Sequence, residues 1–578
     1  MNIHLILIAA TVAMLCVGSA HANSDERAKV EILHETTLNL IRLLVEQGVI
    51  KQEAADEMMR KAQRTAAKKN SEERPQGKTE QTGTEQAGIE QAGTEQARTG
   101  QPKKSEVRVT YVPEHVKREI RDQLREEVVL QAKQERWGDV NAIPEWVSRF
   151  KMEGDIRLRE QADFVPAGNA PAANFQAIGQ QIDNTSEDSY NRERVRMRLG
   201  INANITKGVD LGLRLATGDI LPPVAGFSNL NDSPTSTLQT FGNTGKKYML
   251  WLDQVYLRFT PQDSFTVTAG RMPNPFFVGT VGSIYTSTLA RTGNTIPMAG
   301  VVHTDLLWDV DVNFEGLAVN LHPWLKEDRA IKPFFNAGIF PLQQVNQGET
   351  VKAKDKWFYG AQGGLEFAPA DTDTKVRVGV AFYDFHNVSG IRNPAFGDTL
   401  YNQTAPQYRQ RGNSLYNIDN DGNPTTNLWA LAADYRVVNL TMVADYARFK
   451  PIHVIATADY ARNVGYDQNK ILSRTGQNIT PETTAYQARL TVGYPIISQR
   501  HQWQVFGFYR HSERDSMLDA FTDSNYLGGG TNHKGFTIQG LYGVAHNTWF
   551  GLRYMSYNNI SGLPLAVDAI NLDLNARF

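Results

Sequence analysis

The chain has 578 residues, a formal net charge of −2 and a mean hydropathy of −0.41. No apolar run in it reaches the roughly 18 residues that a spanning helix needs, so the composition excludes a helical membrane protein. With 10% aromatic residues and 46 glycines, the chain has the material for one large β domain.

The first residues predict a secretory signal peptide over residues 1–22. Residues 3–17 are almost all apolar, and Ala20-His21-Ala22 follows them as an Ala-x-Ala cleavage site. The only cysteine, Cys16, lies in this segment. It could be a lipoprotein acceptor, but Leu15 before it is larger than the residue such signals carry. Cleavage after Ala22 would leave a mature chain without cysteine, and therefore without disulfides or thiolate metal ligands.

Residues 23–145 differ in composition from the rest of the chain. Apolar residues at helical spacing predict a helical hairpin over 23–70. Pentads such as TEQTG and TEQAG predict a low-complexity linker over 71–110, because they hold too few apolar residues to bury a core. An amphipathic or coiled-coil helix is predicted within 111–145. Its narrow apolar stripe needs a partner, either another protomer or the domain that follows.

Period-2 alternation dominates residues 146–578 and predicts an all-β domain. Sixteen strands are expected, at residues 147–161, 194–205, 209–216, 248–260, 264–271, 310–322, 331–340, 357–368, 374–385, 427–437, 438–449, 483–494, 502–511, 533–545, 548–557 and 568–578.

The lengths of the connections choose between a barrel and stacked sandwiches. Short turns such as Lys207-Gly208 and His546-Asn547 alternate with connections as long as 218–247, 272–309 and 386–426. Short turns on one side of a membrane and long loops on the other are typical of transmembrane barrels. We therefore predict a transmembrane antiparallel β-barrel of about 16 strands, with 14 or 18 as alternatives.

The last strand, residues 568–578, places Ile570, Leu572 and Leu574 on one face and ends at Phe578. Its length matches the roughly 9–11 residues of a tilted membrane strand. It resembles the final strand of bacterial outer-membrane barrels, and this resemblance implies recognition of Phe578 by the barrel-assembly machinery. The alternative is the last strand of a soluble sandwich.

Aromatic residues predict the membrane interfaces. Trp429 with Tyr435, and Tyr486 with Tyr494, are expected near opposite ends of two apolar strand faces, at headgroup depth. The strand at 502–511 is ambiguous, because Phe506 and Phe508 alternate out of phase with Trp503.

If the apolar phase faces lipid, arginines dominate the opposite phase. Guanidinium groups cost about 2–4 kcal/mol on the lipid face at midplane, so they should point inward. A basic wall favours anions; the alternative is that these arginines only solvate a polar lumen and bind loop acids. The predicted pore-lining residues are Arg157, Arg159, Arg194, Arg196, Arg198, Arg214, Arg258, Arg377 and Arg489, with Arg577 in the same phase. Fewer acids share this phase: Glu153, Asp155, Asp210, Glu366, Asp445 and Asp573.

The connection 272–309 is the predicted constriction. It has several small residues and has acids only at its end, Asp305 and Asp309. Loops of this length in a compact barrel are usually functional. We expect it to fold inward and narrow the channel, as a corresponding loop does in general porins; the alternative is an outside loop.

The order of these segments resembles the putative porin family of Gram-negative bacteria. LVEQGVIKQEAAD, VRVTYVPEHVKREIRDQLREEV and FKMEGDIRLR carry the resemblance. It implies an outer-membrane channel for passive diffusion of small hydrophilic solutes, with the helical region in the periplasm. Outer-membrane lipid, small solutes or ions, and further copies in a trimer are the expected partners. An envelope-tethering or receptor barrel is the alternative.

No catalytic, cofactor or metal site is predicted. Residues 242–247 lack the spacing of a phosphate loop. Asp419-Asn420-Asp421-Gly422-Asn423 resembles half a calcium loop, but its sixth position is Pro424, where such a loop has glycine, and its twelfth is Ala430, where it has a glutamate ligand. This favours an Asx-rich turn, with calcium binding as the alternative. We expect neither enzymatic activity nor nucleic-acid binding.

Overall fold

The computed structural model describes residues 149–578, apart from 181, 183–184, 186–187, 219–235, 243, 246, 280–302, 325–328, 370–371 and 526–528. The predicted signal peptide, helical hairpin, linker and amphipathic helix of residues 1–145 lie outside these described residues. Within the described part, no helix is both long and apolar enough to cross a membrane.

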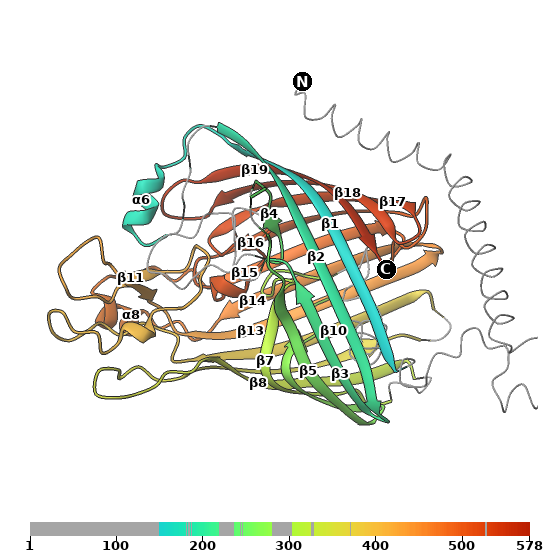
Figure 1. The fold of residues 1–578 in the computed structure, drawn as a ribbon, viewed down its shortest axis with the longest axis horizontal. Helices are drawn as coiled ribbons and strands as arrows, with labels where there is room; N and C mark the ends of the chain where they lie inside the picture. The colour runs from blue at the N-terminus through green and yellow to red at the C-terminus, as the bar shows by residue number, and fades with distance from the viewer. Residues whose placement is uncertain are drawn as a thin grey trace, which may run out of the picture. The chain divides into compact units, whose positions relative to one another are not determined.

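Sixteen antiparallel strands form a closed, tilted barrel (Figure 1). The barrel strands are β1 (Phe150–Val165), β2 (Asp188–Thr206), β3 (Val209–Ala216), β5 (Trp251–Gln262), β6 (Phe265–Pro273), β7 (Asn313–Leu321), β8 (Ile331–Gln343), β9 (Lys356–Phe367), β10 (Thr374–His386), β13 (Tyr435–Phe449), β14 (Ile452–Asn463), β15 (Thr484–Gly493), β16 (Trp503–Ser512), β17 (His533–Ala545), β18 (Thr548–Asn559) and β19 (Ala566–Arg577). The first strand closes the barrel by pairing with both β2 and β19, so that Arg157 stands opposite Arg196 on one side and Asn575 on the other.

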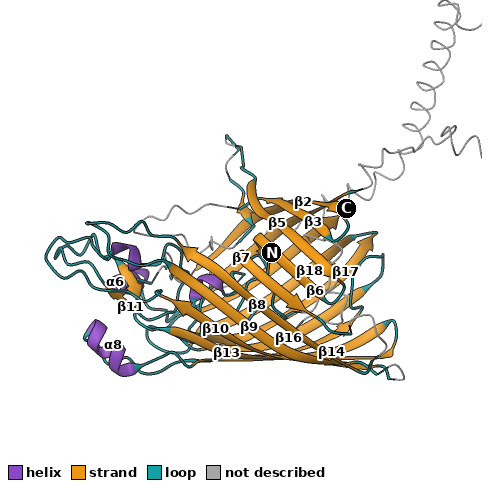
Figure 2. Cartoon of the chain, turned by 90° about the horizontal axis from the view of Figure 1, so that it is seen from below, coloured by secondary structure: helices purple, strands orange, loops and turns teal. Residues whose placement is uncertain are grey.

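The connections between the barrel strands contain short helices and strands. They are β4 (Gln239–Thr240) beside β2, the pair β11 (Leu415–Asn417) and β12 (Trp429–Leu431), the helices α6 (Ala172–Ala177) and α8 (Gln468–Thr475), and the 3-10 turns η2 (Asn402–Thr404) and η3 (Asp519–Phe521). Figure 2 shows α6, α8 and β11 together at the end of the barrel opposite the C-terminus. The long connections therefore gather at one end, as the sequence predicts.

The predicted hairpin 427–437 with 438–449 is wrong, although the count of sixteen is right. Alternation runs unbroken along β13, where Val437 is buried and Val438 is exposed, and the turn comes at Lys450-Pro451. The missed strand is β14, which lies in the predicted loop 450–482. Its outward face carries the small residues Ala456 and Ala458, so its apolar signal is weak. One error cancelled the other.

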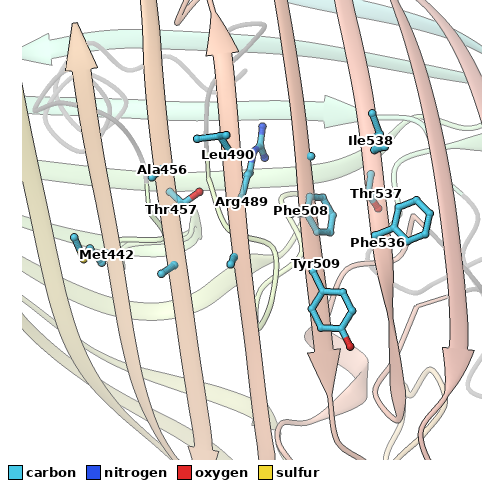
Figure 3. Close-up of a pocket in the computed structure, with 13 residues that line it drawn as sticks. Met442, Ala456, Thr457, Arg489, Leu490, Phe508, Tyr509, Phe536, Thr537 and Ile538 are labelled. Carbon is cyan, nitrogen blue, oxygen red and sulfur yellow. The ribbon is translucent and has the colours of Figure 1, made fainter.

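The barrel is apolar outside and polar inside. On β1, Ile156 and Leu158 are 41% and 44% exposed, whereas Arg159 is 3% exposed. This pattern is the reverse of a soluble core and is that of a barrel facing lipid. On strands β13 to β17, outward residues such as Leu490 and Phe536 wall a shallow groove in the outer surface (Figure 3).

The aromatic girdle is only partly as predicted. Trp429 lies in β12, outside the barrel sheet, and Tyr435 is fully buried, where its hydroxyl donates a hydrogen bond of 2.9 Å to Asp515. Neither residue lies at the lipid interface. The predicted strand 427–437 does not form, and Trp429 and Tyr435 fall instead in β12 and at the start of β13. Tyr486 does face outward, 42% exposed.

Candidate functional site: the arginine-lined lumen

The structure places all ten predicted arginines on the inner face of the barrel. Arg157 and Arg577 are half-buried, and the others are at most 7% exposed: Arg159, Arg194, Arg196, Arg198, Arg214, Arg258, Arg377 and Arg489. They lie there because inward positions alternate with apolar outward positions along each strand.

Carboxylates hold most of the arginines on β1, β2 and β3. Asp155 accepts hydrogen bonds from Arg196 at 2.5 Å and from Arg198 at 2.8 Å. Across the closing seam, Asp573 accepts two from Arg159, at 2.6 and 2.9 Å. Such charge-assisted bonds fix the guanidinium planes in place. On these strands the few inward acids are therefore placed directly against the arginines.

Two of the balancing acids were not recognised in the sequence. Asp253 on β5 accepts a bond of 2.5 Å from Arg214, and Asp311, just before β7, lies 3.3 Å from Arg198. Asp311 falls at a predicted strand end, where its direction could not be assigned.

Aromatic rings support the arginines farther from β1. The Arg489 guanidinium lies 3.6 Å from the centroid of Phe506. Phe506 and Phe508 therefore face inward, which settles the ambiguous strand. Contacts of this kind stabilise a cation inside the barrel without a carboxylate.

Three inward arginines were missed. Arg192 on β2 continues the phase of Arg194 and lies 2.5 Å from Asp163. Arg510 on β16 is 1% exposed and bonds to Asp305 and Asp523, and Arg553 on β18 bonds to Gln539 at 2.7 Å. Arg510 has the same alternation phase as Gln504, Phe506 and Phe508. Assigning the arginine to the inner face would therefore have identified this phase as the inward one.

The described ends of the connection between β6 and β7, residues 274–279 and 303–312, lie inside the barrel. Phe276 packs against the inward rings of Phe314, Phe340, Phe358 and Tyr383 at centroid distances of 5.2–6.3 Å. Trp308 joins the same cluster and is 4% exposed. An apolar inner wall on β7 to β10 thus receives the loop, as expected for a loop that folds inward; residues 280–302 lie outside the described part.

Polar contacts tie the returning end of this loop to other strands. Thr304 donates a bond of 2.5 Å to Asp459 on β14, and the Asp305 carboxylate accepts one from Arg510 on β16. At the far end, Asp311 reaches Arg198 on β2. The segment 303–312 therefore crosses the lumen, and two of its acids, Asp305 and Asp311, contact inward arginines.

Asp309 joins the inward loop to the connection 513–532. Its carboxylate accepts the Ser524 backbone N–H at 2.7 Å, and its own N–H donates to Phe521 at 2.8 Å. Burial, together with the neighbouring Asp311 and Asp523, raises the pKa of Asp309 to about 8. The fold therefore favours the neutral acid here.

This environment predicts that the contact weakens as the pH rises. Between about pH 4 and pH 8, Asp309 is ionised when the segment is open but neutral when it is docked. The free energy that favours the docked segment should therefore fall over this range and level off above it. The variant Asp309→Asn should flatten this decline, measured as the temperature at which the folded gel band disappears across that range. An unchanged pH dependence in Asp309→Asn would contradict the assignment.

The acidic segment at 419–423 forms a turn. Asp421 accepts a bond from the Asn423 backbone N–H at 2.8 Å and another from the Thr426 hydroxyl at 2.5 Å. Within the described ranges, no three His, Cys, Asp or Glu side chains gather as metal ligands would.

The chain is similar to OprB of Pseudomonas putida (11% identity, TM-score 0.41, covering 76% of this chain and 97% of that one) and to the outer membrane channel DcaP of Acinetobacter baumannii (10%, 0.36, 74% and 97%). It is also similar to an anion-selective porin from Comamonas acidovorans (10%, 0.36, 74% and 99%).

No curated protein matches the chain significantly. The model of the putative porin family, in contrast, matches residues 34–578. A closed sixteen-stranded barrel with an apolar outside and a charged inside fits that match. The chain therefore belongs to the putative porin family.

Proposed function

We propose that this protein is an outer-membrane porin, a water-filled channel through which small hydrophilic solutes diffuse passively with a modest preference for anions. The observation that carries the proposal is the polar, arginine-rich inner face of a closed barrel whose outer face is apolar. Sixteen strands is the size at which a barrel can leave an aqueous channel.

The anion preference rests on an excess of positive charge along the part of the inner wall formed by β15 and β18. Arg489 and Arg553 have no carboxylate within 4.0 Å among the described residues, although both are held by other contacts. In such a wall, anions gain more from the local potential than cations do.

Location and assembly complete the proposal. The apolar outer face would contact outer-membrane lipid, residues 1–22 would direct export, and the helices predicted in 23–145 would stay in the periplasm. Recognition of Phe578 by the barrel-assembly machinery, and association into trimers, belong to the same proposal and need separate tests.

Reconstitution in planar bilayers tests the channel directly. Purified full-length protein should produce stepwise conductance in potassium chloride, and a salt gradient should produce a reversal potential of the sign for chloride. Absence of conductance from folded, inserted protein would overturn the channel; a cation-selective channel would overturn only the anion preference.

Arg196 and Arg198 should also contribute to that preference, because they offset the charge of Asp155. The double variant Arg196→Gln/Arg198→Gln leaves Asp155 without its two partners, so the wall gains negative potential. We expect the anion-to-cation permeability ratio to fall by about 3-fold or more, or to invert. Arg462→Gln, at an exposed outward position, is the matched control and should leave the reversal potential unchanged.

A further inference from the structure

The lumen contains a separate cavity of about 580 Å³ at the end of the barrel that carries the long connections. It is bounded by parts of β3 and of β5 to β9, by the returning end of the inward loop, and by the connections after β3, β10 and β16. A cavity of this size accommodates a small organic solute.

One side of this cavity is aromatic. Trp308 lies 5.0 Å from Phe314, 5.4 Å from Phe358 and 5.8 Å from Phe521, measured between ring centroids, and all four residues line the cavity. Flat, apolar walls of this kind favour a flat, apolar ligand, because ring–ring contacts add to the burial of apolar area. A purely hydrophilic solute would leave them unused.

A buried ammonium group completes the lining. Lys356, the first residue of β9, is 5% exposed, and its Nζ donates one hydrogen bond of 2.7 Å to the Ala405 carbonyl. An ammonium has three donors, so two are left for a ligand. Among the described residues, no carboxylate lies within 4.0 Å of Lys356, and a buried charge without a counter-ion is costly.

The acids of the cavity are engaged elsewhere. Asp253 is bonded to Arg214, Asp311 lies beside Arg198, and Glu315 accepts a bond of 2.7 Å from Arg271. Asp519 is the fourth, and the charge of Arg409 acts on it. Lys356 is thus the cation of this lining that lacks an anion.

We propose that this cavity is a solute-binding site for small aromatic carboxylates, with the ring against Trp308 and Phe521 and the carboxylate on Lys356. The inference rests on the proposed function and deepens it: the channel would concentrate aromatic acids at its mouth before they pass the arginine-bearing wall. The aromatic cluster supplies ring selectivity, and the ammonium supplies the sign of charge.

Calorimetric titration of the folded full-length protein in detergent tests the site without requiring conduction. Benzoate should bind, whereas acetate, which lacks the ring, and benzylamine, which carries the opposite charge, should bind at least about 10-fold more weakly. Lys356→Gln should weaken benzoate binding by about 10- to 100-fold, the loss expected for one charge-assisted hydrogen bond. Lys354→Gln, an exposed neighbour, is the control and should bind like the wild type.

The outcomes separate the two proposals. No benzoate binding, equal binding of acetate, stronger binding of benzylamine, or full binding by a folded Lys356→Gln protein would each overturn the site. Single-channel recording is the second measurement. If the protein conducts but benzoate does not reduce the current, the channel is supported and the binding site is overturned. Benzoate binding without any conductance would overturn the channel alone.

Discussion

Deleting Phe578 should sharply reduce the yield of folded barrel while leaving the conductance of each assembled pore nearly unchanged. Phe578 extends the closing seam beyond β19: its backbone N–H and carbonyl bond to Gly154 on β1 at 3.0 and 3.1 Å. Its ring lies over Gly154, where a Cβ atom would come within 2.2 Å of the ring. Two backbone hydrogen bonds contribute about 1–3 kcal/mol, and they lie where the first and last strands must find each other.

Heat-modifiable gel mobility of outer-membrane fractions measures the folded yield, and bilayer recording measures the pore. Phe578→Tyr is the control, because it keeps the backbone bonds and an aromatic ring; it should assemble normally. Normal insertion of the truncated protein would show that Phe578 is not an assembly signal.

Removing the ring of Phe276 should release the inward loop and raise the single-channel conductance. Phe276 is 2% exposed and contacts four inward rings of the barrel wall. Truncating a buried phenylalanine to alanine costs about 3–5 kcal/mol. Here the loss weakens the docking of the loop and not the barrel, because the barrel strands keep their own hydrogen bonds. The loop then occupies the lumen less of the time.

Phe396→Ala is the matched control, since that ring is 80% exposed in the connection 387–434 and should not affect the current. We expect Phe276→Ala to give larger and noisier current steps. Unchanged conductance, with the loop-to-wall contacts shown to be lost, would mean that residues 274–312 do not limit the pore.

Local patterns in the sequence predicted the architecture because a lipid-facing barrel imposes a strict rule. Each strand must alternate apolar and polar residues, and each turn must be short on one side. The rule worked where both phases were pure, as on β1 and β2. It failed on β14, where small outward residues removed the apolar signal, and on β16, where Phe506 and Phe508 face inward to support Arg489 and bury their rings in the lumen.

The sequence by itself determined that the arginines point inward, because a guanidinium on the lipid face is costly wherever it lies. Which acids meet them was decided only by the tertiary structure. Asp155 and Asp573 meet their partners across strand pairs, and Asp311 meets Arg198 across 113 positions of sequence. The cavity around Lys356 likewise forms because four connections distant in sequence fold against the same strands. Alternation is a property of one strand, whereas charge pairing and cavities depend on register and loop packing, which no single strand encodes.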